Sequence, residues 1–555
     1  MGITPDLPTD ADVIIIGGGP CGLTLAIELG RRDVPVILLD QDPGTSTDPK
    51  GNAIQARTME HFRRLGFADV IRTTGLPGDY PTDIAYFTRY TKHELARFRL
   101  PTSSEARKLA RSLSGSWSTP ELPHRCTQML VEKVLLQEAE KLPSVSIRFG
   151  RQVSAVEDRG DHVTVEFSHG EEIGHLTCAY LIGCDGAHSL VRRHLGISLV
   201  GQSGKVRDFM GGRMHAIYFR ASHLLEEMNV DRAWMYWTFN ADRRSFMATV
   251  NGGDEFVFHT QLKADEADKE TTESDARAMF AQSFGRNTKI EILSRASWTA
   301  GFALVAERFH ADRMIIAGDA AHLFTPTGGL GYNTAIEDAV NLGWKLAAVT
   351  KGWAVPALLD TYELERRPNA LRNTAYAQGF ADSIGHFVPT PELEHDGPEG
   401  ERSRIAAGEY LENHARTEFN IPGITFGGRY DGSPAIISDG TEPPPDSANE
   451  YIQSACPGGR APHGWLDGDQ SLFDKFGPEF TLLRMAGEAD TGTIEKAASA
   501  LDVPLAIVDV SNQTLKDIYQ ANLAIIRPDQ IVVWRGDIAP NDPKRLLETV
   551  AVGQF

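Results

Sequence analysis

The stretch DVIIIGGGPCGLTLAIELGRRDVPVILLD (residues 12–40) combines two apolar runs with a glycine turn and a helical pattern. The run at 13–16 is short and rich in β-branched residues, as is typical of a strand buried on both faces. The next segment repeats apolar residues at helical spacing, and a second apolar run at 36–39 closes the unit. This βαβ order predicts a parallel sheet covered by helices, and therefore an α/β fold.

The turn carries the pattern G-x-G-x-x-G, formed by Gly17, Gly19 and Gly22. In a dinucleotide-binding turn the first glycine makes the bend, the second lets a pyrophosphate approach, and the third allows close helix–strand packing. Pro20 fits the first helical turn, where its missing N–H costs little. Asp40 ends the second strand, where a carboxylate can accept both hydroxyls of an adenosine ribose. A single such pattern predicts one resident dinucleotide, and any second one would visit transiently.

A second glycine-rich loop, in LFTPTGGLGYNTAIED (323–338), precedes a helical pattern. Its small residues would leave the N–H groups and the positive dipole end of that helix open to an electron-rich ligand. Asp319, in the run AGDAAH just before this loop, follows a strand-like stretch and could bond a sugar-like chain of hydroxyls. A plain turn is the alternative for either feature alone, but their adjacency favours a ligand site.

Composition narrows the range of partners. A net charge of −20 argues against nucleic acid or an anionic membrane as partner, because both require clustered Lys and Arg. There is no run of about 20 apolar residues, and the acidic N-terminal segment lacks the apolar stretch of a signal peptide. The five cysteines form no C-x-x-C pair and no zinc-like spacing, so we expect no metal site. These features predict a cytoplasmic protein.

Three motifs together resemble the class A FAD-dependent aromatic monooxygenases, in particular the phenol hydroxylase and hydroxybiphenyl monooxygenase branch. They are the glycine turn with Asp40, IGCDGAHSLVRRHLG (182–196) and IIAGDAAHLFTPTGGLGYNTAIEDAVNLGWKL (315–346). A helix of that family is also similar to RCTQMLVEKVL (125–135). The resemblance covers residues 12–370 and continues weakly from 458 onward.

The resemblance implies a Rossmann-like FAD-binding domain of the p-hydroxybenzoate hydroxylase type, an antiparallel-sheet substrate domain and a thioredoxin-like C-terminal domain. Alternating apolar segments between 205 and 300 support the antiparallel sheet. Because the last domain lacks C-x-x-C, we expect it to be structural and not redox-active. The expected limits are 1–80, 103–200 and 295–385 for the FAD-binding domain, 81–102 and 201–294 for the substrate domain, 386–455 for a connector, and 456–555 for the thioredoxin-like domain.

The resemblance also implies which residues hold FAD non-covalently. The first motif of the family binds the ADP half, the second meets both FAD and NAD(P)H, and the third follows the ribityl chain and the isoalloxazine ring. Lys50 stands where many members have Arg, and a surface helix charge is the alternative role for Arg57. Carried over to this chain, the cofactor-binding residues are Gly17, Gly19, Pro20, Gly22, Asp40, Gln41, Lys50, Arg57, Arg125, Gln128, Asp185, Asp319, Gly331, Tyr332 and Asn333.

The reaction that the family performs has two halves. NADPH or NADH, as a transient co-substrate, reduces FAD, and O2 then adds to the reduced flavin to give a C4a-hydroperoxide. This species hydroxylates a phenolic or related aromatic compound, while the protein orients the ring, removes the phenolic proton and excludes water. A small aromatic substrate is therefore the expected partner, and a homodimer is one candidate assembly.

Two segments of alternating residues, together with positions of the resembled family, indicate which residues would contact the substrate. In GRMHAIYF, alternation puts Arg213 and His215 on one face, and in WMYWTF it puts Trp234, Tyr236 and Thr238 opposite Met235 and Trp237. We expect His215 and Tyr236 to be catalytic, with a structural histidine as the alternative for His215. The expected pocket residues are Asn52, where hydroxybiphenyl-type enzymes place a catalytic His, together with Arg213, Trp237 and Pro326, and core packing is the alternative for Trp237.

Two other functions stay open at this stage. The same scaffold could perform Baeyer–Villiger insertion or epoxidation, which the oxygenated product would distinguish. A flavin- and ligand-binding protein without turnover is the alternative from a different class, and its sign would be bound FAD that NAD(P)H never reduces quickly.

Overall fold

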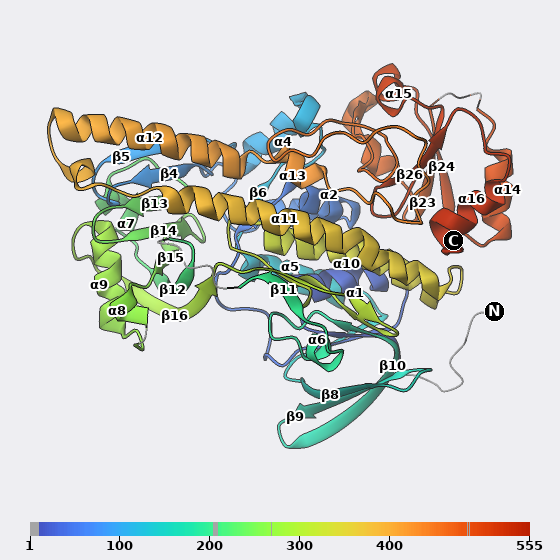
Figure 1. Cartoon of the computed structure of the whole chain (residues 1–555), viewed down its shortest axis with the longest axis horizontal. Helices are drawn as coiled ribbons and strands as arrows, with labels where there is room; N and C mark the ends of the chain where they lie inside the picture. The colour runs from blue at the N-terminus through green and yellow to red at the C-terminus, as the bar shows by residue number, and fades with distance from the viewer. Residues whose placement is uncertain (1–9, 204–208, 268, 486, 488) are drawn as a thin grey trace.

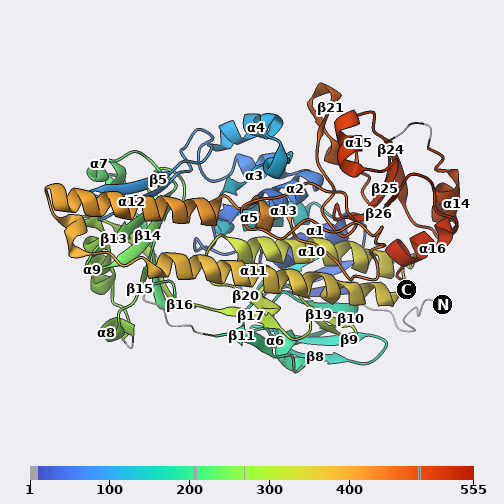
Figure 2. The ribbon, with the colours of Figure 1, turned by 45° about the horizontal axis from the view of Figure 1, so that its top comes forward.

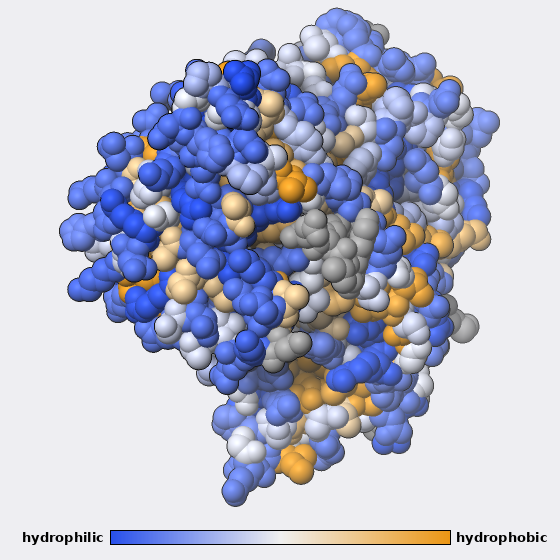
Figure 3. Space-filling model, turned by 60° about the vertical axis from the view of Figure 1, so that its left-hand side comes forward, coloured by the Kyte–Doolittle hydropathy of each residue, from blue (hydrophilic) through white to orange (hydrophobic). Residues whose placement is uncertain are grey.

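The computed structural model describes residues 10–203, 209–267, 269–485, 487 and 489–555. The acidic start of the chain, on which the absence of a signal peptide was argued, lies largely outside these residues. Figure 1 shows a strand-rich group on the left, a central group around two long helices, and a C-terminal group at the upper right. The face in Figure 3 is mostly hydrophilic with scattered apolar residues, in keeping with the acidic composition.

The first sheet is the α/β core that the opening stretch predicts. Its main path has the order β18-β19-β10-β1-β2-β7, and β1 pairs in parallel with both neighbours, with Ile14 opposite Leu181 and Ile37. A βαβ unit with a parallel sheet is therefore confirmed. The expected antiparallel excursion is also present, because β8 and β9 extend β10 as an antiparallel ribbon. The strands are β1 (Ala11–Ile16), β2 (Val36–Leu39), β7 (Val145–Arg148), β8 (Gln152–Asp158), β9 (Val163–His169), β10 (Glu172–Gly183), β18 (His310–Ala311) and β19 (Met314–Ile316).

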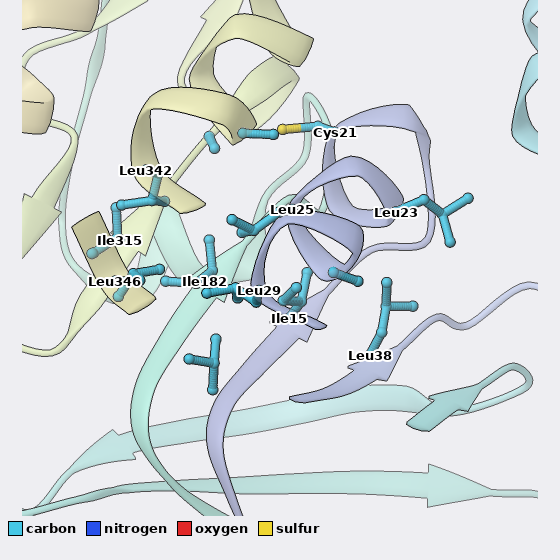
Figure 4. Packing of buried hydrophobic residues seen from close by; sticks show 14 of the residues in the cluster. Ile15, Cys21, Leu23, Leu25, Leu29, Leu38, Ile182, Ile315, Leu342 and Leu346 are labelled. Carbon is cyan, nitrogen blue, oxygen red and sulfur yellow. The ribbon is translucent and has the colours of Figure 1, made fainter. Parts of the chain in front are cut away.

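Helix α1 (Pro20–Gly30) is the best-packed element of this core. Every residue after Pro20 is buried, between the parallel strands and the helices α5 (Gln128–Glu140) and α10 (Leu330–Thr350). Figure 4 shows Leu25 and Leu29 of α1 near Leu342 and Leu346 of α10, with Ile182 and Ile315 of the sheet among them. The two helices approach closely at Gly343, where an added Cβ would lie 2.6 Å from the Cβ of Glu28.

The second sheet has seven strands in the order β16-β12-β15-β14-β13-β4-β5. All neighbours are antiparallel except β13 and β4, so the predicted antiparallel sheet is confirmed. One face packs on α7 (Leu224–Met228) and α9 (Glu273–Phe284), and the other on α11 (Asp360–His386) and α12 (Pro398–Phe419), which run side by side in Figures 1 and 2. The strands are β4 (Ile84–Phe87), β5 (Glu94–Phe98), β12 (Gly212–Arg220), β13 (Met235–Phe239), β14 (Arg244–Thr249), β15 (Glu255–Gln261) and β16 (Glu291–Ala300).

Shorter elements connect the two sheets. The strands among them form a three-stranded sheet of β11, β17 and β20 and a two-stranded pair of β3 and β6. These elements are β3 (Ala53–Ile54), β6 (His124–Arg125), β11 (Leu199–Gln202), β17 (Ala303–Ala306), β20 (His322–Leu323), α2 (Ala56–Arg64), α3 (Ala68–Arg72), α4 (Ser103–Ser112), α6 (Leu190–His194), α8 (Ala264–Ala267) and α13 (Pro422–Phe426), with short helical turns at Gly115–Trp117, Gly318–Ala320, Pro356–Leu359 and Pro391–Glu394.

The C-terminal sheet has the order β24-β23-β25-β26, with β23 parallel to β24 and antiparallel to β25. This β-α-β-α-β-β-α sequence is that of a thioredoxin-like domain, and the five cysteines of the chain, of which only Cys456 lies near it, are all free thiols. Its elements are β23 (Phe480–Arg484), α14 (Gly492–Ala500), β24 (Leu505–Asp509), α15 (Gln513–Tyr519), β25 (Leu523–Ile526), β26 (Val532–Gly536) and α16 (Pro543–Leu547), preceded by β21 (Trp465–Leu466) and β22 (Gln470–Ser471), with further turns at Asp467–Asp469, Leu472–Lys475 and Glu548–Val552.

A buried charge cluster joins this C-terminal sheet to the central helices. Glu365 of α11 accepts hydrogen bonds from Arg527 at 2.8 and 2.9 Å and from Lys345 of α10 at 2.7 Å. All three side chains are fully buried, and the two cations hold the pKa of Glu365 below its usual range although burial opposes ionisation. Removing any one member would leave an uncompensated buried charge.

The close contact between α1 and α10 at Gly343 can be tested by its effect on the free energy of unfolding. We expect Gly343→Ala to lower the free energy of unfolding by about 1–3 kcal/mol, because the added methyl overlaps Glu28 and overpacking has that cost. Denaturant unfolding measures it. The control is Gly379→Ala in α11, where an added Cβ meets nothing within 4 Å, and this variant should gain about 0.5–1 kcal/mol from helix propensity. Equal effects at the two glycines would contradict the packing described.

Candidate active site

The glycine turn after β1 is shaped by contacts that exclude side chains at two of its three glycines. Gly17 has φ +108, and an added Cβ would lie 2.2 Å from the carbonyl oxygen of Cys184. At Gly22 an added Cβ would lie 2.0 Å from the carbonyl oxygen of Gly17. Gly19 differs, because nothing lies within 4 Å of its added Cβ. The protein therefore requires glycine at the first and third positions for its own packing and leaves open space at the second.

Asp40 lies at the end of β2 beside this turn. Its carboxylate accepts hydrogen bonds from the N–H groups of Gly18 and Asp42. Partial burial raises the pKa of Asp40, although these two N–H groups act in the opposite direction. Each carboxylate oxygen keeps further acceptor capacity, so the group can still receive ribose hydroxyls. Gln41 follows as an exposed residue.

The ends of β10 and β19 bring the other two motifs together. Arg192 of α6 donates to the carbonyl oxygens of Ala187, at 2.8 Å, and Ala320, at 2.9 Å, and so ties the second motif to the third. Asp185 accepts from the N–H groups of Leu190 and Val191 through one oxygen. Its other oxygen has no partner within the described part of the chain.

Asp319 lies next to this junction. Its side chain is exposed, yet the surrounding protein raises its pKa by desolvation, an effect that His322 and the exposed Lys50 oppose. Lys50 also acts electrostatically on Asp40, so its ammonium lies near both acidic strand ends.

A buried carboxylate that the motif comparison did not single out supports these loops. Asp338 of α10 lies 2.6 Å from Nε2 of His322, and accepts from Arg366 at 2.8 Å and from the N–H of Gly318 at 3.2 Å. Burial opposes its ionisation, but His322 and Arg366 hold the pKa of Asp338 below its usual range. Helical spacing could not predict this carboxylate as buried, because its partners come from β20 and α11.

The loop before α10 is held by Asn333. Gly328 and Gly329 both have left-handed backbone, with φ +62 and +64, and α10 begins at Leu330. The Asn333 amide accepts from Gln55 and Thr58, and donates to the carbonyl oxygens of Ala53 and Gly329. Its side chain thus anchors the loop, which leaves the first N–H groups of the helix, including those of Gly331 and Tyr332, as donors for a ligand. Pro326 is exposed at the edge of the loop.

Buried polar groups close to α5 fit an anionic, polar ligand. Arg125 is buried, stacks its guanidinium 4.4 Å from the ring of Trp234 and pairs with no carboxylate of the described residues. Burial lowers the pKa of Arg125 to about 10. The hydroxyl of Tyr332 is buried without a partner among the described residues, and Gln128 donates to Glu132. An unpaired buried cation is costly in a protein, so this arrangement suits a site for a pyrophosphate-bearing cofactor.

Arg57 bonds to residues of α2 and of the C-terminal domain, and not to the glycine turn or the glycine loop. It donates to Glu60 at 2.8 Å, to Gln530 at 2.7 Å and to the carbonyl oxygen of Asp529 at 2.5 Å, so its guanidinium joins α2 to the C-terminal domain. It is buried, and so it is not a surface charge either. Spacing along α2 could not reveal this role because the partner comes from more than 400 residues later.

An aromatic cluster covers the face of the seven-stranded sheet that meets α11 and α12. Trp237 lies 6.2 Å from Tyr86, 6.0 Å from Phe209 and 4.8 Å from Phe246, measured between ring centroids. Ala53 packs on the same cluster and also lies against Gly329 of the glycine loop. Its neighbour in sequence, Asn52, is partly exposed. The indole N–H of Trp237 and the hydroxyl of Tyr86 are buried without partners in the part of the chain that the structure describes.

The two expected catalytic residues lie on the opposite face of this sheet. Tyr236 packs in the cluster of α7 and α9, and its hydroxyl accepts from the N–H of Ala233 at 2.8 Å. His215 lies 3.1 Å from the hydroxyl of Ser297, and burial lowers its pKa to about 4. Because strand residues alternate between faces, neither side chain lies on the face of the sheet that carries Trp237. Arg213 is exposed and donates to the carbonyl oxygen of Ala267.

The alternation predicted for 234–238 is correct for Met235, Tyr236 and Trp237 but wrong for Trp234. This residue precedes β13, and it belongs to the same cluster as Trp237.

A histidine does face the aromatic cluster. His259 of β15 stacks on Phe246 at 4.6 Å and lies 6.1 Å from Trp298, both measured between centroids. It is half-buried, its Nδ1 has no partner among the described residues, and desolvation by the surrounding protein lowers its pKa to about 4. The run EFVFHTQ carries no local signal for this position, since only the pairing of Phe246 with His259 across β14 and β15 reveals it.

The turn, the acidic strand ends and the glycine loop define a flavoprotein of the dinucleotide-binding α/β class. Residues 10–377 match the family described as FAD binding domain, and residues 454–552 match that described as aromatic-ring hydroxylase, C-terminal. The chain belongs to the FAD-dependent aromatic-ring hydroxylases, and the expected cofactor FAD and the expected fold class are confirmed.

Individual relatives agree with this assignment. The FAD-dependent monooxygenase apdD of Emericella nidulans is 31% identical over 96% of this chain and 89% of its own. Phenol 2-monooxygenase of a Pseudomonas species is 27% identical over 98% of this chain and 93% of its own. A solved structure of RebC, soaked with chromopyrrolic acid and holding 7-carboxy-K252c, superposes with a TM-score of 0.87 at 33% identity, covering 99% of this chain and 100% of RebC.

None of the helices in the described ranges combines the length and the apolar character that a bilayer crossing requires. Within the same ranges, His, Cys, Asp and Glu side chains form no group suited to a metal ion.

Because there is open space beside Gly19, a substitution there can test cofactor binding without disturbing the packing of the protein. We expect Gly19→Ala to leave the stability of the FAD-free protein within about 0.5 kcal/mol, because the methyl meets no protein atom. FAD affinity should fall on the order of tenfold or more, the factor that corresponds to losing about 1.4 kcal/mol of contact. Flavin titration measures it. Gly22→Ala is the matched variant and should unfold the turn itself, so equal stability losses at both positions would contradict the proposed approach of the cofactor.

His259 predicts a pH effect on stability. Its folded-state pKa of about 4 lies below the ordinary value of 6.5, so the unfolded chain binds the proton first as pH falls. Stability should therefore decline from pH 6.5 towards 4, by about 3 kcal/mol from this group, and His259→Phe should remove that part of the decline. Denaturant unfolding across this range measures the slope. Replacing the exposed His223 by Phe controls for loss of an imidazole, and equal slopes in all three proteins would refute the assignment.

Proposed function

We propose that the protein is a single-component monooxygenase that consumes NAD(P)H and O2 to hydroxylate a phenolic or polyketide-derived aromatic. The observation that carries this proposal is the aromatic cluster around Trp237, with two unpartnered polar groups in an otherwise apolar surrounding. An indole N–H and a phenol hydroxyl among aromatic rings suit a planar ligand with oxygen atoms at its edge. The aromatic ligand named for RebC and the phenol named for the Pseudomonas relative support the same class of substrate.

The residues at the strand ends support a non-covalent FAD site. We assign the pyrophosphate to the turn at Gly17, Gly19, Pro20 and Gly22 and to Arg125, and the adenosine ribose to Asp40. Asp319, Asp185 and Gln128 face the remaining chain of hydroxyls, and the N–H groups of Gly331, Tyr332 and Asn333 face the electron-rich edge of the ring system. FAD bound there would supply electron transfer from NAD(P)H to oxygen and delivery of one oxygen atom. Lys50, near both Asp40 and Asp319, adds a positive charge to this site.

The chain's own contribution is to hold and deprotonate the aromatic. Trp237 and Tyr86 donate hydrogen bonds to its oxygen atoms, and Asn52 and Pro326 border it from the side of the glycine loop. His259 is the neutral imidazole on this face and is our candidate proton acceptor, in place of His215 and Tyr236. The buried rings exclude water from the reacting atoms.

We also retain the expected division of the chain, with β4, β5 and β12–β16 as the substrate domain and β23–β26 as the C-terminal domain. A cytoplasmic location and a small aromatic partner follow from the same function. The homodimer stays a candidate assembly.

A panel of phenols and larger planar aromatics tests this function. The purified yellow protein is mixed with NADH or NADPH, and pyridine-nucleotide oxidation, oxygen uptake, peroxide and product are followed together. We expect at least one aromatic to accelerate oxidation, with little peroxide released and a hydroxylated ring as product. A product with an oxygen inserted into the ring, or an epoxide, would show that the protein performs Baeyer–Villiger insertion or epoxidation and not hydroxylation. If no aromatic accelerates the reduction of the flavin, the proposed hydroxylase activity is wrong.

Trp237→Phe examines the substrate face in the same assay. It removes the unpartnered N–H but keeps an aromatic ring, so we expect KM for the aromatic to rise about tenfold, as loss of one hydrogen bond of about 1.4 kcal/mol would give. Trp344→Phe is the matched control, since its indole N–H is also buried without a partner among the described residues but lies in the cluster shared with the C-terminal domain. A similar rise in both variants would contradict the placement of the substrate.

A further inference from the structure

Glu418 lies in α12, within the segment that separates the two matched families at 377 and 454. Its side chain is almost fully buried, and one oxygen accepts a hydrogen bond of 2.8 Å from the N–H of Gly328. A segment expected to be a connector thus delivers a carboxylate to the glycine loop in front of α10.

The Gly328 peptide groups are held from two sides. Gln55 donates a hydrogen bond to the carbonyl oxygen of Gly328 at 2.8 Å, and Glu418 accepts a hydrogen bond from the N–H of Gly328. An added Cβ at Gly328 would lie 3.2 Å from the ring of Phe380, and one at Gly329 would lie 2.8 Å from the Cβ of Ala53. The two residues in left-handed backbone therefore have little room to move, and Glu418 is the anionic part of that restraint.

A second buried side chain lies beside the carboxylate. The other oxygen of Glu418 is 2.8 Å from Nε2 of His414, one turn earlier in α12, although these two atoms make no hydrogen bond with each other. Nδ1 of His414 lies 3.0 Å from the hydroxyl of Ser383 in α11. The hydrogen bond from Gly328 is therefore the polar contact that holds Glu418, and its loss would leave a carboxylate at this depth with a large desolvation cost.

Glu418 also acts on the aromatic cluster. Burial, followed by the charge of Glu418, raises the pKa of Tyr86 well above its usual value, so this phenol stays protonated and able to donate. One carboxylate is therefore near both the glycine loop and the Tyr86 hydroxyl that faces the proposed substrate.

We propose that Glu418 is a positioning residue that sets the orientation of the Gly328–Gly329 turn, and with it the approach between the flavin ring and the aromatic substrate. This inference rests on the proposed function for the substrate, but only on the family's FAD site for the loop. A displacement of about 1 Å between reacting groups can cost up to about 100-fold in rate, so a loosened turn should let oxygen be reduced without reaching the ring.

The test compares Glu418→Ala with Glu418→Gln in the FAD-loaded protein. Gln keeps an oxygen that can accept from the Gly328 N–H, whereas Ala removes it. We expect Ala to change the visible absorption and circular dichroism of bound FAD and to raise peroxide released per NAD(P)H severalfold, and we expect Gln to restore both towards wild type. Glu412→Gln, an exposed position of the same helix, is the control and should match wild type.

Each result decides the inference. If Ala and Gln both lose thermal stability but keep the wild-type flavin spectrum and peroxide fraction, Glu418 is only structural and the proposal is wrong. If the Ala variant does not fold, Glu418→Asp replaces it, because the shorter side chain keeps the charge but withdraws from Gly328 and should alter the spectrum in the same way. If wild type hydroxylates no aromatic, the proposed function fails, and the flavin spectra of the variants still decide the role of Glu418.

Discussion

The buried carboxylate of Asp338 is the contact on which the arrangement of the site depends. It receives Arg366 from α11, lies against His322 from β20 and holds the Gly318 N–H, so three segments that are distant in sequence meet at one side chain. The turn that carries Asp319 after β19 is held in place by the hydrogen bond from the N–H of Gly318 to Asp338. The residues proposed to face the cofactor are thus supported by buried charged groups behind them, and the cost of burying Asp338 is offset by His322 and Arg366.

The same principle recurs at the boundary with the C-terminal sheet. Glu365 pairs with Lys345 and Arg527, and Glu60 pairs with Arg57 and Arg460, so the last domain is joined to the first through buried ion pairs in addition to apolar contacts. A thioredoxin-like domain without its cysteine pair therefore has a clear physical task here. Its arginines pair with buried carboxylates of α2 and α11, and Lys345 of α10 shares one of these carboxylates.

Local patterns predicted what depends on local sequence. The βαβ unit, the parallel sheet, the glycine turn and the long helix after residue 329 all follow from periodicity and from glycine chemistry, and the structure contains each of them. What could not be predicted depends on strand register and on contacts between distant segments. A histidine on a strand can be a base, which favours His215 from sequence alone, but the register of β12 places it on the face opposite Trp237. His259 lies on the face of Trp237 because β15 pairs it with Phe246 of β14. Arg57 and Glu418 have partners hundreds or tens of residues away, and no spacing rule along one helix could reveal them.

The hydrogen bond between α12 and the glycine loop also bears on how members of this family can be recombined. A chimera whose breakpoint falls between 378 and 417 would take Gly328 from one parent and its carboxylate from another. Such a hybrid could keep both matched regions intact and still misalign the glycine loop inside the first of them. For domain exchange, the unit to transplant therefore extends beyond the matched FAD-binding region and includes the whole of α12.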